Sequence, residues 1–188
     1  YTLADAVRDG VLCRYFYRPH TVHLTEDEQE EWSEISRRIR QMMARQQATE
    51  SDVGMPDKIK MALIERARIV KRAAAKVDLA VAILADHARP SDRWLVYCDS
   101  LAQLTDVCSA LAGVGITALP FHSKMTGDRK ATLRWLDEEG GVVVAIKCLD
   151  EGVDVPSVSH ALILASSKNP REYIQRRGRV LRRSPGKA

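Results

Sequence analysis

The spacing of hydrophobic residues changes near residue 91, and this change divides the chain into two parts. In the first part, apolar residues recur every three to four positions over 25–47 and 57–88, a period that predicts two helices. Residues 14–24 instead alternate between apolar and polar, which predicts an extended, strand-like segment. We therefore expect residues 1–91 to form a connector strand and helices that lead into a second part.

Local signals mark the ends of these two helices. Thr25 and Glu28 have the spacing of a capping box, in which each side chain accepts a hydrogen bond from the other residue's backbone N–H. Pro90 stops the second helix, because proline has no N–H to donate and clashes with a helical turn before it.

After residue 91, short apolar runs alternate with amphipathic stretches. The apolar runs are 94–98, 116–121, 142–146 and 161–166, and the helical stretches are about 100–112, 126–138 and 170–182. Runs that are apolar on both faces are typical of parallel strands covered by helices on both sides. We predict an α/β fold over 92–188, a doubly wound parallel sheet with helices on both faces.

Ligands of such sheets bind at the carboxyl ends of the strands. Polar residues follow each predicted strand in this sequence, although loops are often polar without any function. The residues of interest are Asp99, Ser100, His122, Ser123, Lys124, Lys147, Gly152, Asp154 and Ser167.

Positive charge is concentrated at the end of the chain. The net charge is +4, but residues 171–188 alone carry +6 and the preceding 170 residues carry about −2. At 100° per residue, Gln175, Arg179 and Arg182 fall within about 60° of one another on the helix predicted over 170–182. An ordinary basic helix face would explain this period, but the charge density favours a local phosphate partner.

Guanidinium groups bind phosphate oxygens bidentately and keep their charge, so these arginines suit phosphate chemistry. However, the sequence has no GxxxxGK[ST] loop, since Gly140 and Gly141 lead directly into an apolar strand. We therefore expect no ATP hydrolysis by this chain alone. The four cysteines form no CxxC pair, which indicates reduced thiols in a cytoplasmic protein and no metal site.

Three segments resemble conserved motifs of superfamily 2 helicases and translocases. WLVYCDS (94–100) resembles their motif IV, VVVAIKCLDEGVDVP (142–156) resembles motif V, and QRRGRVLR (175–182) resembles motif VI. The longer stretch 161–179 is similar to the form found in restriction, repair and XPB-like DNA translocases. The resemblance implies the second, C-terminal RecA-like domain of such an enzyme.

The resemblance also implies roles for individual residues. Arg179 and Arg182 match the arginine fingers that reach ATP, whose Mg²⁺ is held by an N-terminal RecA-like lobe of the same chain. Gln175, Gly152 and Asp154 match positions beside the nucleotide. Contacts with nucleic acid are expected from Ser100, Ser123, Lys124, Lys147 and Arg176. DNA is the expected nucleic acid, and RNA is the alternative.

The sequence departs from the motif V pattern at one position. Many members of the family have a phosphate-binding threonine where this chain has Ile146. Either Lys147 takes over that contact or backbone amides make it.

Two further classes of function fit the same residues. The arginines could neutralise backbone phosphates in a non-catalytic nucleic-acid-binding module, or they could regulate a partner ATPase in trans. A phosphate-binding loop and an acidic DExx motif upstream of Tyr1 would favour the helicase interpretation over both.

Overall fold

The computed structural model describes residues 5, 8–10, 13–47, 55–146 and 158–165. The chain divides into two compact units. One unit comprises residues 21–76, and the other comprises residues 1–20 together with 77–188.

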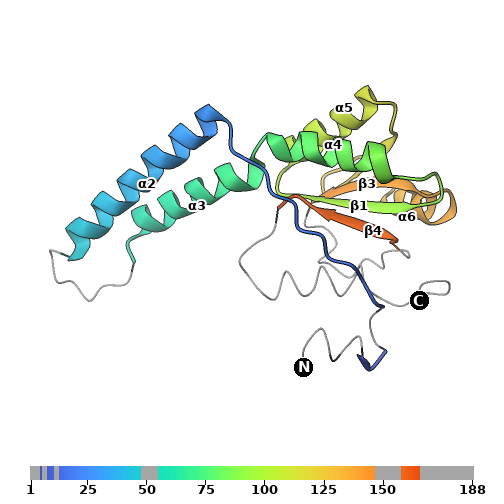
Figure 1. Ribbon diagram of the computed structural model, residues 1–188, viewed down its shortest axis with the longest axis horizontal. Helices are drawn as coiled ribbons and strands as arrows, with labels where there is room; N and C mark the ends of the chain where they lie inside the picture. The colour runs from blue at the N-terminus through green and yellow to red at the C-terminus, as the bar shows by residue number, and fades with distance from the viewer. Residues whose placement is uncertain (1–4, 6–7, 11–12, 48–54, 147–157, 166–188) are drawn as a thin grey trace. The chain divides into compact units, whose positions relative to one another are not determined.

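The first unit is a pair of helices, α2 (Glu26–Gln47) and α3 (Asp57–Arg72), packed against each other (Figure 1). Ile35 and Ile39 of α2 pack against Ile59 and Ala62 of α3, and all four are buried. These residues lie at the predicted three-to-four spacing, which places one apolar stripe on each helix. The unit is therefore held by a small core between two amphipathic faces.

The predicted capping box at the start of α2 is confirmed. The Glu28 N–H donates to Thr25 Oγ1 at 3.3 Å, and the Thr25 N–H donates to Glu28 Oε2 at 3.0 Å.

The prediction of one helix over 57–88 is wrong, because α3 ends at Arg72 and α4 runs separately over Ala75–His87.

Glu28 also explains where the long helix breaks. The backbone N–H of Ala74 donates to Glu28 Oε1 at 2.9 Å. Ala73 leaves the helical region with φ −43° and ψ 125°, and its side chain is buried. Alanine favours helix intrinsically, so the break comes from this tertiary hydrogen bond rather than from local propensity.

The predicted strand-like segment over 14–24 is also wrong as a strand. Residues 13–25 form neither helix nor strand. A strand needs a partner for its backbone groups, and Pro19 removes one of the donors that a ladder would use.

The second unit contains a four-stranded parallel sheet with helices on both faces, as predicted. Its strands are β1 (Arg93–Cys98), β2 (Ala118–Phe121), β3 (Gly141–Ile146) and β4 (His160–Ile163). The spatial order is β2-β3-β1-β4, and every neighbouring pair is parallel. The remaining described helices are α5 (Leu101–Gly113) and α6 (Arg129–Glu138).

Alternate residues of β1 point to opposite faces of the sheet. Trp94 and Val96 contact the core formed with α4 and α5, whereas Leu95 and Tyr97 contact the core formed with α6. Figure 1 shows α4 and α5 on one side of the strands and α6 on the other. Both faces are therefore covered, which is why the strands are apolar throughout.

A glycine pair connects α6 to β3. Gly140 and Gly141 have φ angles of 78° and 114°, in the left-handed region that favours glycine. A Cβ on Gly140 would lie 2.6 Å from the Pro90 carbonyl oxygen, and the Gly141 N–H donates to the Asp92 carbonyl oxygen at 2.7 Å. The turn before β3 thus packs directly against the loop before β1.

Candidate functional site

The four parallel strands all end at one edge of the sheet. Their last residues are Cys98, Phe121, Ile146 and Ile163. Ser100 follows β1, and Ser123 and Lys124 follow β2, with the end of β3 between them. The described site residues therefore follow strands at the edge where parallel sheets bind ligands.

Ser100 begins helix α5 as its N-cap. Its hydroxyl oxygen accepts from the Gln103 N–H at 3.4 Å, and the first turn of α5 contains no acidic residue. Such a helix start directs backbone N–H groups toward the strand ends and favours an anion there. The Ser100 hydroxyl hydrogen can donate to a phosphate oxygen while the oxygen serves as the cap.

Gln103 fixes the loop that presents Ser100. Its side chain is buried, and Oε1 accepts from the Asp99 N–H at 2.9 Å. Sequence reasoning missed this residue, although the spacing of Ser100 and Gln103 is that of a capping box. Here the amide reaches one residue further back than in a standard box, to Asp99 instead of the N-cap itself.

The loop after β2 presents a serine and a lysine to solvent. The His122 carbonyl oxygen accepts from the Met125 N–H at 3.2 Å, which closes a turn around Ser123 and Lys124. Met125 packs against the core beneath α6 and anchors this turn. Ser123 and Lys124 are exposed and make no side-chain hydrogen bond or ion pair within the described part of the chain. The ammonium group of Lys124 is thus open to an anionic partner.

The other predicted site residues lie outside the described residues. They are Lys147, Gly152, Asp154, Gln175, Arg176, Arg179 and Arg182. Lys147 directly follows the end of β3, and Ile146, at the position of the family's threonine, is half-buried against the core.

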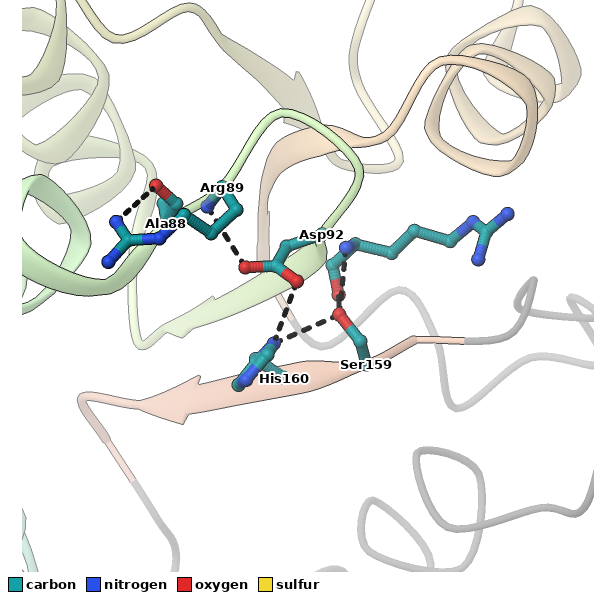
Figure 2. Close-up of polar contacts among 6 residues, drawn as sticks. Ala88, Arg89, Asp92, Ser159 and His160 are labelled. Atoms are coloured by element: carbon teal, nitrogen blue, oxygen red, sulfur yellow. Dashed lines mark hydrogen bonds and ion pairs between the residues drawn. The ribbon is translucent and has the colours of Figure 1, made fainter. Parts of the chain in front are cut away.

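A serine, a histidine and an aspartate meet at the opposite edge of the sheet, where β1 and β4 begin (Figure 2). Ser159 Oγ lies 2.9 Å from His160 Nδ1, and Asp92 Oδ1 lies 3.9 Å from that same nitrogen. A nucleophilic triad needs its acid and its nucleophile on different ring nitrogens, so this cluster cannot act as one.

The same cluster has a structural role. Ser159 Oγ accepts from the Arg93 N–H at 2.8 Å and lies 3.2 Å from the Arg93 carbonyl oxygen, to which it can donate. The His160 ring stacks on Trp94 with centroids 4.3 Å apart. These contacts attach the edge strand β4 to β1.

Burial perturbs the thiols beside the site. It raises the pKa of Cys98, at the end of β1, from 9.0 to about 12, and it also raises the pKa of Cys108 in α5. Nearby Cys108, Asp106 and Asp99 add to the shift of Cys98. Cys98 is therefore a neutral core residue and not a nucleophile at physiological pH.

Within the described ranges, no group of three or more His, Cys, Asp or Glu side chains could hold a metal ion. No helix in those ranges is both long and apolar enough to span a membrane.

Comparison with known proteins identifies the family. The model of the helicase conserved C-terminal domain matches residues 75–184, which is more than half of the chain. The chain belongs to this family. The match covers all four strands of the sheet and both segments that resemble motifs V and VI, so the resemblance to superfamily 2 is confirmed.

Curated relatives of this helicase domain include enzymes named for DNA and for RNA. ATP-dependent DNA helicase Q1 of Pongo abelii is 31% identical over 88 residues, which cover 46% of this chain and 14% of that protein. DNA 3'-5' translocase XPB2 of Sulfurisphaera tokodaii is 38% identical over 55 residues, covering 29% and 12%. ATP-dependent RNA helicase MAK5 of Gibberella zeae is 26% identical over 95 residues, covering 50% and 12%. The chain spans only a small part of these relatives' lengths.

A solved structure supports the fold of the domain. The C-terminal domain of the DEAD-box protein Dbp5 superposes with a TM-score of 0.50 at 19% identity, covering 56% of this chain and 62% of that one. The likeness confirms the RecA-like α/β architecture.

Proposed function

We propose that this chain is the C-terminal RecA-like lobe of an ATP-dependent helicase or translocase that acts on DNA. The observation that carries the proposal is the parallel sheet, whose four strands end at one edge. The segments that resemble motifs IV and V continue directly from β1 and β3 at this edge, and the segment that resembles motif VI lies beyond β4. The residues that would contact nucleotide and nucleic acid thus follow these strands in the sequence.

In this proposal, the arginines of the helix predicted over 170–182 contact the nucleotide. Arg179 and Arg182 would place their guanidinium groups on the γ-phosphate of ATP bound to the N-terminal RecA-like lobe of the same protein, which also holds Mg²⁺. Gln175, Gly152 and Asp154 would lie beside the nucleotide. Guanidinium groups stabilise the charge that spreads over the phosphoryl oxygens, and ATP hydrolysis supplies the energy of each cycle.

The loops after β1, β2 and β3 would follow the phosphate backbone of the nucleic acid. Ser100 can donate from the start of α5, and Lys124 offers a free ammonium group beside Ser123. Lys147 directly follows β3 in the sequence and would add a cation there, and Arg176 would add another. Such contacts position a strand without reading its sequence.

The part of the chain before the sheet has a supporting role. We assign residues 1–91 as the connector from the N-terminal lobe. A cytoplasmic location is part of this proposal, and within the described residues Cys13, Cys98 and Cys108 are free thiols.

The alternative is a module that binds nucleic acid without catalysis or that acts on a partner ATPase. Lys124, which has no ion-pair partner among the described residues, favours binding of an anion, but it does not distinguish the two interpretations. ATP hydrolysis by the purified full-length protein, without any partner ATPase, would distinguish them.

Substitution of one arginine finger tests the proposal. In the full-length protein, Arg182→Ala should lower DNA-stimulated ATP turnover by about 10³-fold or more, while the Kd for single-stranded DNA changes little. The exposed Arg37→Ala on α2 removes an equal charge outside the site and should leave turnover unchanged. Unaltered turnover in Arg182→Ala would exclude the arginine-finger role, and stimulation by RNA alone would reassign the substrate.

A further inference from the structure

An exposed aromatic side chain between two arginines lies well outside the helicase motifs. Phe16 is 96% exposed, and Tyr15 and Tyr17 beside it are 36% and 62% exposed. Single exposed apolar side chains are common, but contiguous exposed ones mark interaction sites, and these three aromatic residues are consecutive. The segment therefore offers a surface that the described part of the chain does not cover.

The backbone presents this surface in an extended form. Residues 13–20 belong to the unit that holds the sheet, and Figure 1 shows them as a drawn-out trace without helix or strand. Pro19 restricts Arg18 to extended conformations, because its ring clashes with a helical residue before it. In an extended backbone, residues two apart share a side. An extended backbone would place Arg14, Phe16 and Arg18 on one side and the two tyrosines on the other.

The charges on that side are unpaired. Arg14 and Arg18 are exposed, and within the described residues neither makes a hydrogen bond or an ion pair. No acidic residue occurs from 11 to 25, so the segment has nothing local to neutralise its cations. Among the described residues, the guanidinium groups of Arg14 and Arg18 thus have no partner, and they lie on either side of the exposed Phe16 in the sequence.

We propose that Arg14, Phe16 and Arg18 form a contact site for single-stranded nucleic acid, in which Phe16 stacks on a base and the arginines bind the flanking phosphates. The proposal rests on the function proposed above, which supplies nucleic acid as the substrate. An aromatic ring stacks on any base, and arginines two residues apart from it on each side match a repeating backbone charge. A protein partner would more often meet such cations with carboxylates.

The test measures binding of full-length protein to a fluorescein-labelled oligothymidylate without nucleotide, by fluorescence anisotropy. Phe16→Ala should weaken binding roughly 5- to 150-fold, and Phe16→Tyr, which keeps the ring, should retain affinity. The double variant Arg14→Ala, Arg18→Ala should lower the slope of log K against log salt by about 1.4, as expected for two lost contacts to a single strand. The Arg37→Ala variant should leave both quantities unchanged.

Other outcomes of these binding measurements would overturn the proposed nucleic-acid contact. An unchanged affinity in Phe16→Ala would overturn the proposal. If the Tm of this variant also drops, the ring packs against another part of the protein instead of a base. Since ATP turnover is measured separately, a protein that binds through Phe16 but never hydrolyses ATP would refute the helicase function alone. A protein that hydrolyses ATP but binds the oligothymidylate equally well without Phe16 would refute this site alone.

Discussion

Three glycines of the sheet unit allow backbone strain and steric clash to be measured separately. Gly140 and Gly115 have nearly the same left-handed φ, 78° and 77°, but only Gly140 is crowded. A Cβ on Gly140 would lie 2.6 Å from the Pro90 carbonyl oxygen, whereas a Cβ on Gly115 or Gly113 meets nothing within 4 Å. Gly113, at the end of α5, lacks the positive φ. Alanine therefore introduces neither effect at Gly113, backbone strain alone at Gly115, and both backbone strain and steric clash at Gly140.

The expected free energies of unfolding follow from these geometries. Gly113→Ala should be neutral or stabilise by about 0.4–1 kcal/mol, because alanine lowers the entropy of the unfolded chain. Gly115→Ala should lose about 1–2 kcal/mol relative to Gly113→Ala, the cost of a left-handed residue with a Cβ. Gly140→Ala should lose a further 1–3 kcal/mol or so, because the loop before β1 must move away from the new methyl group.

Urea unfolding followed by tryptophan fluorescence measures these values. Trp94 and Trp135 both belong to the sheet unit, so the signal includes the region that changes. If Gly140→Ala proves as stable as Gly115→Ala, the turn before β3 does not pack against the loop before β1 as described. If Gly115→Ala matches Gly113→Ala, the strain assigned to positive φ is wrong.

Two further predictions concern Glu28 and Cys98. Glu28→Ala should destabilise the helix pair by about 1–2 kcal/mol and speed amide exchange at Ala74, because it removes the carboxylate that accepts from the Thr25 N–H and the Ala74 N–H. Glu30→Ala should change neither quantity, and an unchanged Ala74 exchange rate in Glu28→Ala would contradict the proposed cause of the helix break. The raised pKa of Cys98 favours the protonated thiol in the folded state, so its contribution is complete below pH 9 and should fall by about 1.4 kcal/mol per pH unit toward pH 12. Cys98→Ala should flatten that alkaline decline in urea titrations, and a decline as steep as in the parent protein would assign it to other groups.

Much of the sheet unit could be predicted from local patterns. The runs 94–98 and 142–146 are apolar on both faces, and a strand of that kind has to be covered on both sides by helices. The capping box of Thr25 and Glu28 is equally local, since its atoms lie within one helical turn. Predictions based on such short-range signals are confirmed here.

The failures occur where a residue's environment comes from far along the chain. The break after Arg72 depends on Glu28, which is distant in sequence, and an alanine-rich stretch gives no sign of it. Residues 14–24 alternate as a strand does, but a strand forms only where a partner accepts its backbone hydrogen bonds. Gln103 is the exception, because its partner Asp99 lies only four residues away and its spacing from Ser100 is that of a capping box.

The sequence by itself determined that four apolar runs after residue 91 contain strands, that these strands run parallel, and hence that Ser100, Ser123 and Lys124 follow strand ends. Only the tertiary structure decided the order β2-β3-β1-β4, which places the end of β3 at Ile146 between the ends of β2 and β1. The physical reason is that a side-chain pattern reports which face of an element is buried, while the choice of neighbour depends on the packing of α4, α5 and α6 against the whole sheet.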